Sequence, residues 1–103
     1  MAATNSPEIV TGILVDEVTE MTIDDVARFC SVRREKIVEL VSEGIVPAGG
    51  RGPEEWRFSG STLARAGKAI RLEIDLEINL AAVALILDLL DEIEDLRRER
   101  GRS

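Results

Sequence analysis

Apolar residues recur at helical spacing soon after the first twenty residues of the chain. They occupy positions i, i+3, i+4 and i+7: Ile23, Val26, Ala27 and Cys30. Positions with this spacing fall along one face of a helix. Thr22 stands just before them and two aspartates follow Ile23, which is typical of a helix N-cap followed by acids in the first turn. The pattern predicts a short helix that begins after Thr22.

A second short helix is predicted directly after a turn at residues 30–32. Its buried face is expected to consist of Ile37, Leu40 and Val41. Gly44 is expected to end it, because glycine readily adopts the left-handed conformation that closes many helices. Two short helices joined by a tight turn are typical of a helix-turn-helix.

A small β-hairpin, or wing, is predicted after the second helix. Residues 46–47 form its first arm and residues 48–53 form a loop rich in glycine. The second arm spans residues 56–58, where Trp56 and Phe58 share one face because side chains alternate along a strand. Trp56 is expected to be at least half buried against the third helix.

Two longer helices complete the pattern. The first is capped by Ser59 or Ser61 and continues to about Leu76. Three apolar side chains on it are expected in the core: Leu63, Ile70 and Ile74. Asn79 caps the last helix, which continues to about Arg100. This order of elements predicts a mainly α fold, a winged helix-turn-helix with a long C-terminal helix.

The last helix, residues 79–100, is apolar on two sides. One stripe consists of Leu80, Val83, Leu87 and Leu90, and the other of Leu85, Ile86, Leu89, Ile93 and Leu96. One stripe is enough to pack a helix on a domain of this size, so the second would be a large exposed patch unless a partner covered it. We therefore expect a homodimer, since self-association with two-fold symmetry commonly hides such a patch. The candidate interface residues are Leu85, Leu89, Ile93 and Leu96.

The chain of 103 residues is expected to form a single domain over residues 13–103, after an N-terminal tail of residues 1–12. Partial alternation of Ile13, Val15 and Val18 predicts a short strand at the start of this domain. No apolar run is long enough to span a bilayer, and the first residues lack the pattern of a secretory signal. We therefore expect a cytoplasmic protein.

The composition excludes most catalytic and metal chemistry. The sequence has no histidine, which is the most frequent general acid or base and the commonest metal ligand. Its one cysteine, Cys30, cannot form an intrachain disulfide or a cysteine-rich zinc site, and is expected to be a small buried hydrophobe. We expect a protein that is not an enzyme, has no cofactor and works by binding another macromolecule.

The net charge of −7 indicates what kind of macromolecule that is. Twenty acidic residues outnumber thirteen basic ones. A surface of this charge repels phosphates on average, so this acidic protein suits a basic protein partner better than a nucleic acid.

Several stretches of the sequence resemble known families. Residues 21–27, 30–34 and 43–47 are similar to the DNA-binding head of MerR-type regulators. Within that superfamily the chain resembles the CbpM chaperone-modulator family more closely. The stretches that carry this closer resemblance are residues 43–46, 55–58, 69–72, 75–77 and 87–93. The resemblance covers roughly residues 13–100, which is nearly the whole chain.

The resemblance implies a chaperone modulator that inhibits a DnaJ-like co-chaperone of the CbpA type. Members of the family bind the J-domain and block its stimulation of the DnaK-type chaperone. A J-domain has a basic helix that docks on the chaperone, and an acidic decoy for that helix agrees with the net charge of −7. MerR-type proteins also dimerise through a long C-terminal helix, as expected here.

Two acidic patches are candidates for contact with such a partner. Four carboxylates on the last helix follow i, i+3, i+4 and i+7 and so share one face: Asp88, Asp91, Glu92 and Asp95. Glu35 and Glu39 on the second helix form the alternative patch. An ordinary solvated face is the competing interpretation of both. Arg65, Lys68 and Arg71 on the third helix are expected to pair with neighbouring acids or, alternatively, to contact a partner.

A MerR-type DNA-binding transcriptional regulator is the alternative function. Arg33, Arg34 and Lys36 would then contact phosphates at the start of the second helix. Against this, Glu35 and Glu39 lie opposite the buried stripe, on the face that a recognition helix turns to the groove. Carboxylates there would meet the phosphate backbone, so the sequence disfavours DNA as a partner.

Overall fold

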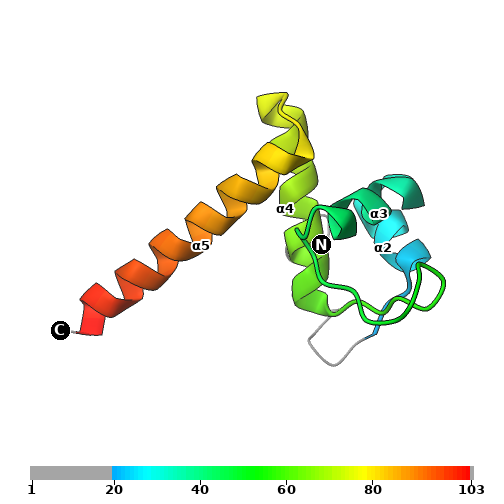
Figure 1. Cartoon of the computed structure of the whole chain (residues 1–103), viewed down its shortest axis with the longest axis horizontal. Helices are drawn as coiled ribbons and strands as arrows, with labels where there is room; N and C mark the ends of the chain where they lie inside the picture. The colour runs from blue at the N-terminus through cyan, green and yellow to red at the C-terminus, as the bar shows by residue number, and fades with distance from the viewer. Residues whose placement is uncertain (1–19, 103) are drawn as a thin grey trace, which may run out of the picture.

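The computed structural model describes residues 20–102, and this part of the chain is mainly helical. Its helices are α2 (Ile23–Cys30), α3 (Arg34–Ser42), α4 (Gly60–Leu76) and α5 (Leu80–Arg102). In Figure 1, α2 and α3 lie on one side of α4, and α5 leaves the top of α4 towards the other side. The predicted order of helices is confirmed. The predicted tail and the strand near Ile13 lie outside the described residues.

Helix α2 begins and ends as the sequence predicts. The Thr22 side chain accepts a hydrogen bond from the Asp25 N–H (3.2 Å), and the Asp25 carboxylate accepts one from the Thr22 N–H (3.0 Å). That backbone hydrogen bond is the main reason why the pKa of Asp25 lies below its ordinary value. Ser31, in the left-handed conformation with φ 59°, closes the helix.

Helix α3 ends at the predicted glycine. Gly44 has φ 73°, and its N–H donates to the Val41 carbonyl at 3.0 Å. The Ile45 N–H donates to the Leu40 carbonyl at 2.9 Å. Ile37 and Leu40 are fully buried, so α3 packs on α2 through the predicted face.

The predicted β-hairpin is not confirmed. Among the described residues the pairing consists of two isolated antiparallel bridges, Gly49 with Arg57 and Met21 with Phe58. The second arm therefore pairs with Gly49 of the predicted loop and with Met21 before α2, and not with Val46 and Pro47. Proline has no N–H to donate, and glycine supplies no side chain to pack, so the loop that follows α3 does not extend into a strand.

The core lies where α2, α3, α4 and the first turns of α5 meet, and its largest side chain comes from the predicted wing. Phe58 is 2% exposed, and Trp56 meets it edge to face with ring centroids 6.2 Å apart. Trp56 is more than half buried against the core, as expected. Cys30 also packs against the core, and burial raises the pKa of its thiol.

Helix α4 packs against both α2 and α5. Ser59 is its N-cap and accepts from the Thr62 N–H at 3.4 Å, which decides between the two predicted caps. Leu63 and Ile70 are buried as predicted, but the prediction for Ile74 was wrong, since this side chain is 66% exposed. Ile74 lies in the last turn of α4, near the reversal into α5, where no described element covers it.

Helix α5 begins at the predicted cap, where the Asn79 side-chain oxygen accepts from the Ala82 N–H at 2.9 Å. The first three members of its inner stripe are buried: Leu80, Val83 and Leu87. The fourth, Leu90, is exposed, so the prediction that the whole stripe packs on the domain was wrong at that position. No helix in the described part of the chain is long and apolar enough to cross a membrane.

Candidate partner-binding surfaces

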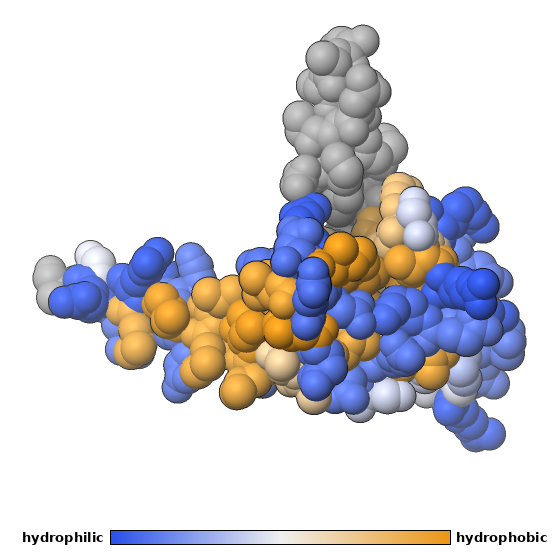
Figure 2. All heavy atoms as spheres, turned by 90° about the horizontal axis from the view of Figure 1, so that it is seen from above, coloured by the Kyte–Doolittle hydropathy of each residue, from blue (hydrophilic) through white to orange (hydrophobic). Residues whose placement is uncertain are grey.

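The outer side of α5 presents an unpaired apolar stripe. Figure 2 shows hydrophobic side chains along the arm that projects from the body of the molecule. The stripe consists of the predicted interface residues with their exposed fractions: Leu85 (61%), Leu89 (50%), Ile93 (46%) and Leu96 (56%). All four side chains point away from the core, as expected for a second apolar stripe that does not pack on the domain. An exposed apolar surface of this kind favours contact with the apolar face of another molecule.

The predicted acidic stripe lies on α5 beside the apolar one, but three of its four members have intramolecular partners. Asp91 pairs with Arg65 on α4 (Nη1 to Oδ2, 3.2 Å), and Asp88 lies 3.7 Å from the same guanidinium. Asp95 pairs with Arg98 one turn later. Glu92 is exposed and makes no ion pair within the described range 20–102. The counter-charges explain why a helix tolerates four carboxylates on one face.

Arg65 connects this stripe to the part of the molecule that contains α2, α3 and the segment after them, which is called the head below. Besides the two aspartates, it reaches the segment after α3, where its Nε donates to the Ile45 carbonyl at 2.6 Å. The interpretation that cations on α4 pair with neighbouring acids is therefore confirmed for Arg65.

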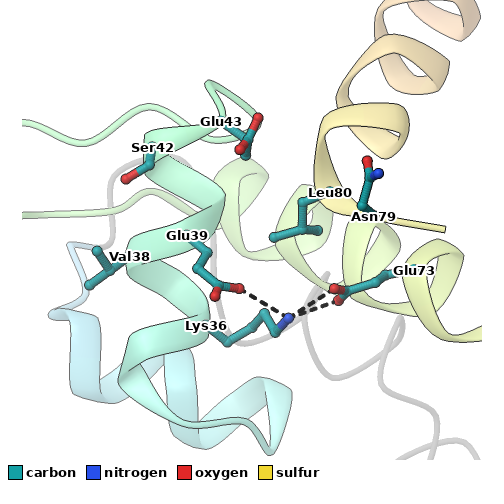
Figure 3. Close-up of a pocket in the computed structure, with 8 residues that line it drawn as sticks. All are labelled: Lys36, Val38, Glu39, Ser42, Glu43, Glu73, Asn79 and Leu80. Carbon is teal, nitrogen blue, oxygen red and sulfur yellow. Dashed lines mark hydrogen bonds and ion pairs between the residues drawn. The ribbon is translucent and has the colours of Figure 1, made fainter. Parts of the chain in front are cut away.

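Glu39 of the alternative acidic patch lines a groove of about 430 Å³ between α3 and the junction of α4 with α5. Figure 3 shows the Lys36 ammonium between the carboxylates of Glu39 and Glu73, at 3.1 and 2.9 Å. The hydrogen bond to Glu73 is the main cause that raises the pKa of Lys36 above its ordinary value. Glu35 is exposed on α3. Of the two predicted patch residues, Glu39 is thus partly neutralised by an internal cation.

The cations of the helix-turn-helix also form ion pairs with carboxylates of the same chain. Arg34 donates to Glu54 at 2.9 Å and lies 3.8 Å from Asp24. Lys36 is engaged by Glu39 and Glu73. Two of the three side chains that would contact phosphate are therefore paired with carboxylates of the chain itself.

Sequence reasoning did not find these long-range pairs. Arg34 and Glu54 are 20 positions apart, and Lys36 and Glu73 are 37 apart. Helical spacing identifies neighbours three or four positions away, and no local signal links residues at larger separations. Among residues 20–102, no group of three or more potential ligand side chains is placed to hold a metal ion.

Comparison with known proteins gives the family. The model of the MerR HTH family regulatory protein matches residues 21–101. A chaperone modulatory protein CbpM from Coxiella burnetii (strain Dugway 5J108-111) is 36% identical over 91 residues, which cover 88% of this chain and 86% of the relative. The chain belongs to the CbpM family. CbpM proteins from Pseudomonas putida (strain W619) and Pseudomonas entomophila (strain L48) are 34% and 33% identical over 84 residues, 82% of this chain and 83% of each relative.

The family-model match extends over both candidate surfaces. The family-model match begins just before α2 and ends in the last turn of α5, so it includes the helix-turn-helix and the projecting helix. Membership in a family of chaperone modulators gives the chain a role in modulating a chaperone system.

Proposed function

We propose that this chain binds the J-domain of a DnaJ-like co-chaperone of the CbpA type and inhibits its stimulation of the DnaK-type chaperone. The observation that carries the proposal is the similarity to CbpM chaperone modulators over more than four fifths of the chain. The net charge of −7 supports a basic partner. The protein acts in the cytoplasm by binding alone, without catalysis or a cofactor.

The acidic stripe on α5 is the proposed contact for the basic helix of the J-domain. Glu92 and Asp95 are its best-placed members. Glu92 makes no ion pair within residues 20–102, and Asp95 pairs only with the exposed Arg98 on the same helix. Asp88 and Asp91, in contrast, share the Arg65 guanidinium of α4. Charge complementarity mainly raises the association rate and fixes the orientation, while neighbouring apolar contacts supply most of the affinity. Binding should therefore weaken as salt rises, chiefly through slower association.

The apolar stripe on α5 is the proposed interface of a homodimer. Its four side chains are each about half exposed in the single chain. A second copy offers the same stripe, and a two-fold axis brings the two together with self-complementary contacts. The α3 patch of Glu35 and Glu39 is the alternative J-domain contact.

DNA binding is the second candidate function, and the MerR family-model match is the observation that favours it. The ion pairs of Arg34 and Lys36 with internal carboxylates disfavour it, because phosphates would have to replace those carboxylates. The wild-type chain is therefore expected to show no sequence preference for duplex DNA in a gel-shift assay at moderate salt.

The test uses a purified J-domain from the CbpA-type co-chaperone of the same organism, measured by calorimetry at moderate salt. Glu92→Lys with Asp95→Lys should weaken J-domain binding more than tenfold, about 1.4 kcal/mol. The matched control is Asp75→Lys with Glu77→Lys, which makes the same change in net charge on exposed residues at the end of α4. Glu35→Lys with Glu39→Lys tests the alternative patch.

The outcomes separate the possibilities. Equal loss in the control would mean that net charge, not the stripe, governs binding. Wild-type affinity in the stripe variant, with loss in the α3 variant, would move the contact to α3. A wild-type chain that ignores the J-domain and binds duplex DNA with sequence preference would refute the proposed function.

A further inference from the structure

Helix α5 is held by the body of the molecule over only part of its length. Its buried side chains end at Leu87, and every residue from Asp88 to Gly101 is exposed. This outer part projects from the head in Figure 1. At 1.5 Å per residue, the arm from Asp88 to the end of the helix is about 22 Å long.

The arm meets the head through one guanidinium just beyond the last buried residue. Arg65 reaches Asp88 and Asp91 in the first turn of the arm, at 3.7 and 3.2 Å. Its Nε donates to the Ile45 carbonyl at 2.6 Å, in the segment that leaves the helix-turn-helix. A single side chain thus joins the head, α4 and α5.

The geometry of arginine makes this contact directional. The guanidinium is planar, and its N–H groups form a rigid fork. Because Nε is fixed on the Ile45 carbonyl, the two terminal nitrogens are aimed at the aspartates of α5. Asp88 and Asp91 are themselves well exposed, so these ion pairs contribute little to the free energy of unfolding.

We propose that Arg65 is a positioning residue that fixes the direction of α5 relative to the helix-turn-helix. That direction sets where the proposed J-domain contact on the arm lies relative to the alternative contact on α3. A tilt of about 10° at Leu87 would move the end of a 22 Å arm by about 4 Å. A partner that touches both surfaces then loses affinity, because it must restore the angle when it binds. This consequence rests on the proposed function, whereas the positioning itself does not.

The experiment measures the head-to-arm distance by electron paramagnetic resonance between two spin labels. The labels are placed at Arg33→Cys and Glu94→Cys, both exposed, in a Cys30→Ser background. Labelled chains are diluted tenfold with unlabelled chains, so that distances within one chain dominate. Arg65→Gln should shift or broaden the distribution by up to about 2 Å for a tilt of about 10°, since that tilt displaces residue 94 by about 2 Å.

Three further variants make the result specific. Asp88→Asn with Asp91→Asn removes the α5 side of the contact without touching Ile45, and should reproduce the shift even if Arg65→Gln folds poorly. Arg65→Lys retains the charge but not the fork, and should give an intermediate distribution. Lys68→Gln removes a cation from the same helix one turn away, and should leave the distribution unchanged.

An unchanged distribution in the folded Asp88→Asn, Asp91→Asn variant would overturn the proposal. The same variants are then titrated with the J-domain, where Arg65→Gln should lower affinity at least fivefold and Arg65→Lys should recover part of the loss. A distance shift with wild-type J-domain affinity would leave the positioning role intact and show that the partner uses only one surface. A wild-type chain that does not bind the J-domain would refute the proposed function while the distance result still decides the role of Arg65.

Discussion

Leu89 and Leu87 lie two positions apart on α5 and provide a matched pair for testing the dimer. Leu89 is 50% exposed on the outer stripe, whereas Leu87 is 1% exposed against the core. Replacement of Leu89 should therefore affect association, and replacement of Leu87 should affect folding. The contrast separates an interface from a core position on one helix.

The magnitude follows from the exposed fraction. Complete burial of a leucine side chain contributes about 1.5–3 kcal/mol, so covering the exposed half of Leu89 is worth roughly 1 kcal/mol. A two-fold interface buries two copies, so Leu89→Ala should cost about 2 kcal/mol of dimer stability. That is roughly a thirtyfold increase in the dissociation constant. Leu89→Glu places two carboxylates in an apolar contact between acidic chains, and should give monomers.

Sedimentation equilibrium over a range of concentrations measures association, and urea denaturation measures folding. Leu89→Ala should raise the dissociation constant of the dimer and retain a cooperative urea transition. Leu87→Ala should lower the free energy of unfolding by about 2–5 kcal/mol, because it opens a cavity beside the core. A wild-type chain that sediments as a monomer at high concentration would refute the dimer, and a dimeric Leu89→Glu variant would place its interface elsewhere.

Four other predictions concern the head. Trp56→Ala should cost about 3 kcal/mol in urea denaturation, since it removes the edge-to-face partner of the buried Phe58; a loss below about 1 kcal/mol would show that Trp56 is not part of the core. Thr22→Ala should cost about 1 kcal/mol through the lost cap. Because the folded-state pKa of Asp25 is depressed, its stabilising contribution is present above the unfolded-state pKa and lost as pH falls through the folded value. The stability difference between wild type and Asp25→Asn should thus shrink below about pH 4, and a constant difference would contradict this account. Cys30 should react with iodoacetamide at pH 8 more slowly than a free thiol, because burial raises its pKa; an equal rate would show that the thiol is open.

The helices of the head could be predicted because their ends are decided by near neighbours. The Thr22–Asp25 capping box, the left-handed Gly44 and the Ser59 cap each involve residues within four positions. All the residues that form such a cap are close neighbours in the sequence, so the sequence alone is enough to recognise it. The i, i+3, i+4, i+7 spacing likewise identified the buried face of α2, where Ile23 and Val26 are buried.

The extent of each buried stripe could not be predicted in the same way. Ile74 and Leu90 have the right spacing but lie beyond the end of the element that would cover them. Helical periodicity gives the direction in which a side chain points. It does not show how far the neighbouring element extends to cover that side chain. The predicted wing is not confirmed for a related reason, since Phe58 pairs with Met21, which lies far away in the sequence.

The position of the acidic stripe on α5 could be predicted from the sequence, but its ion pairs with other residues could not. Spacing alone placed four carboxylates on one face of α5, and the structure has all four exposed there. The pairing of Asp91 with Arg65 joins residues 26 positions apart, and it depends on the angle at which α5 crosses α4. That angle is a tertiary property, so the local sequence does not show that the acidic stripe is partly neutralised by cations of the same chain.

The ion pairs of the head bear on the choice between the two functions. In a DNA-binding head, the cations at the start of the second helix contact phosphates. Here Arg34 meets carboxylates of α2 and of the loop after α3, and Lys36 meets one of α4. A phosphate at this site would have to replace those carboxylates while approaching the exposed Glu35. The cations that would serve a regulator on DNA instead join the elements of the head to one another, and the remaining surface has an excess of acid that suits a basic protein partner.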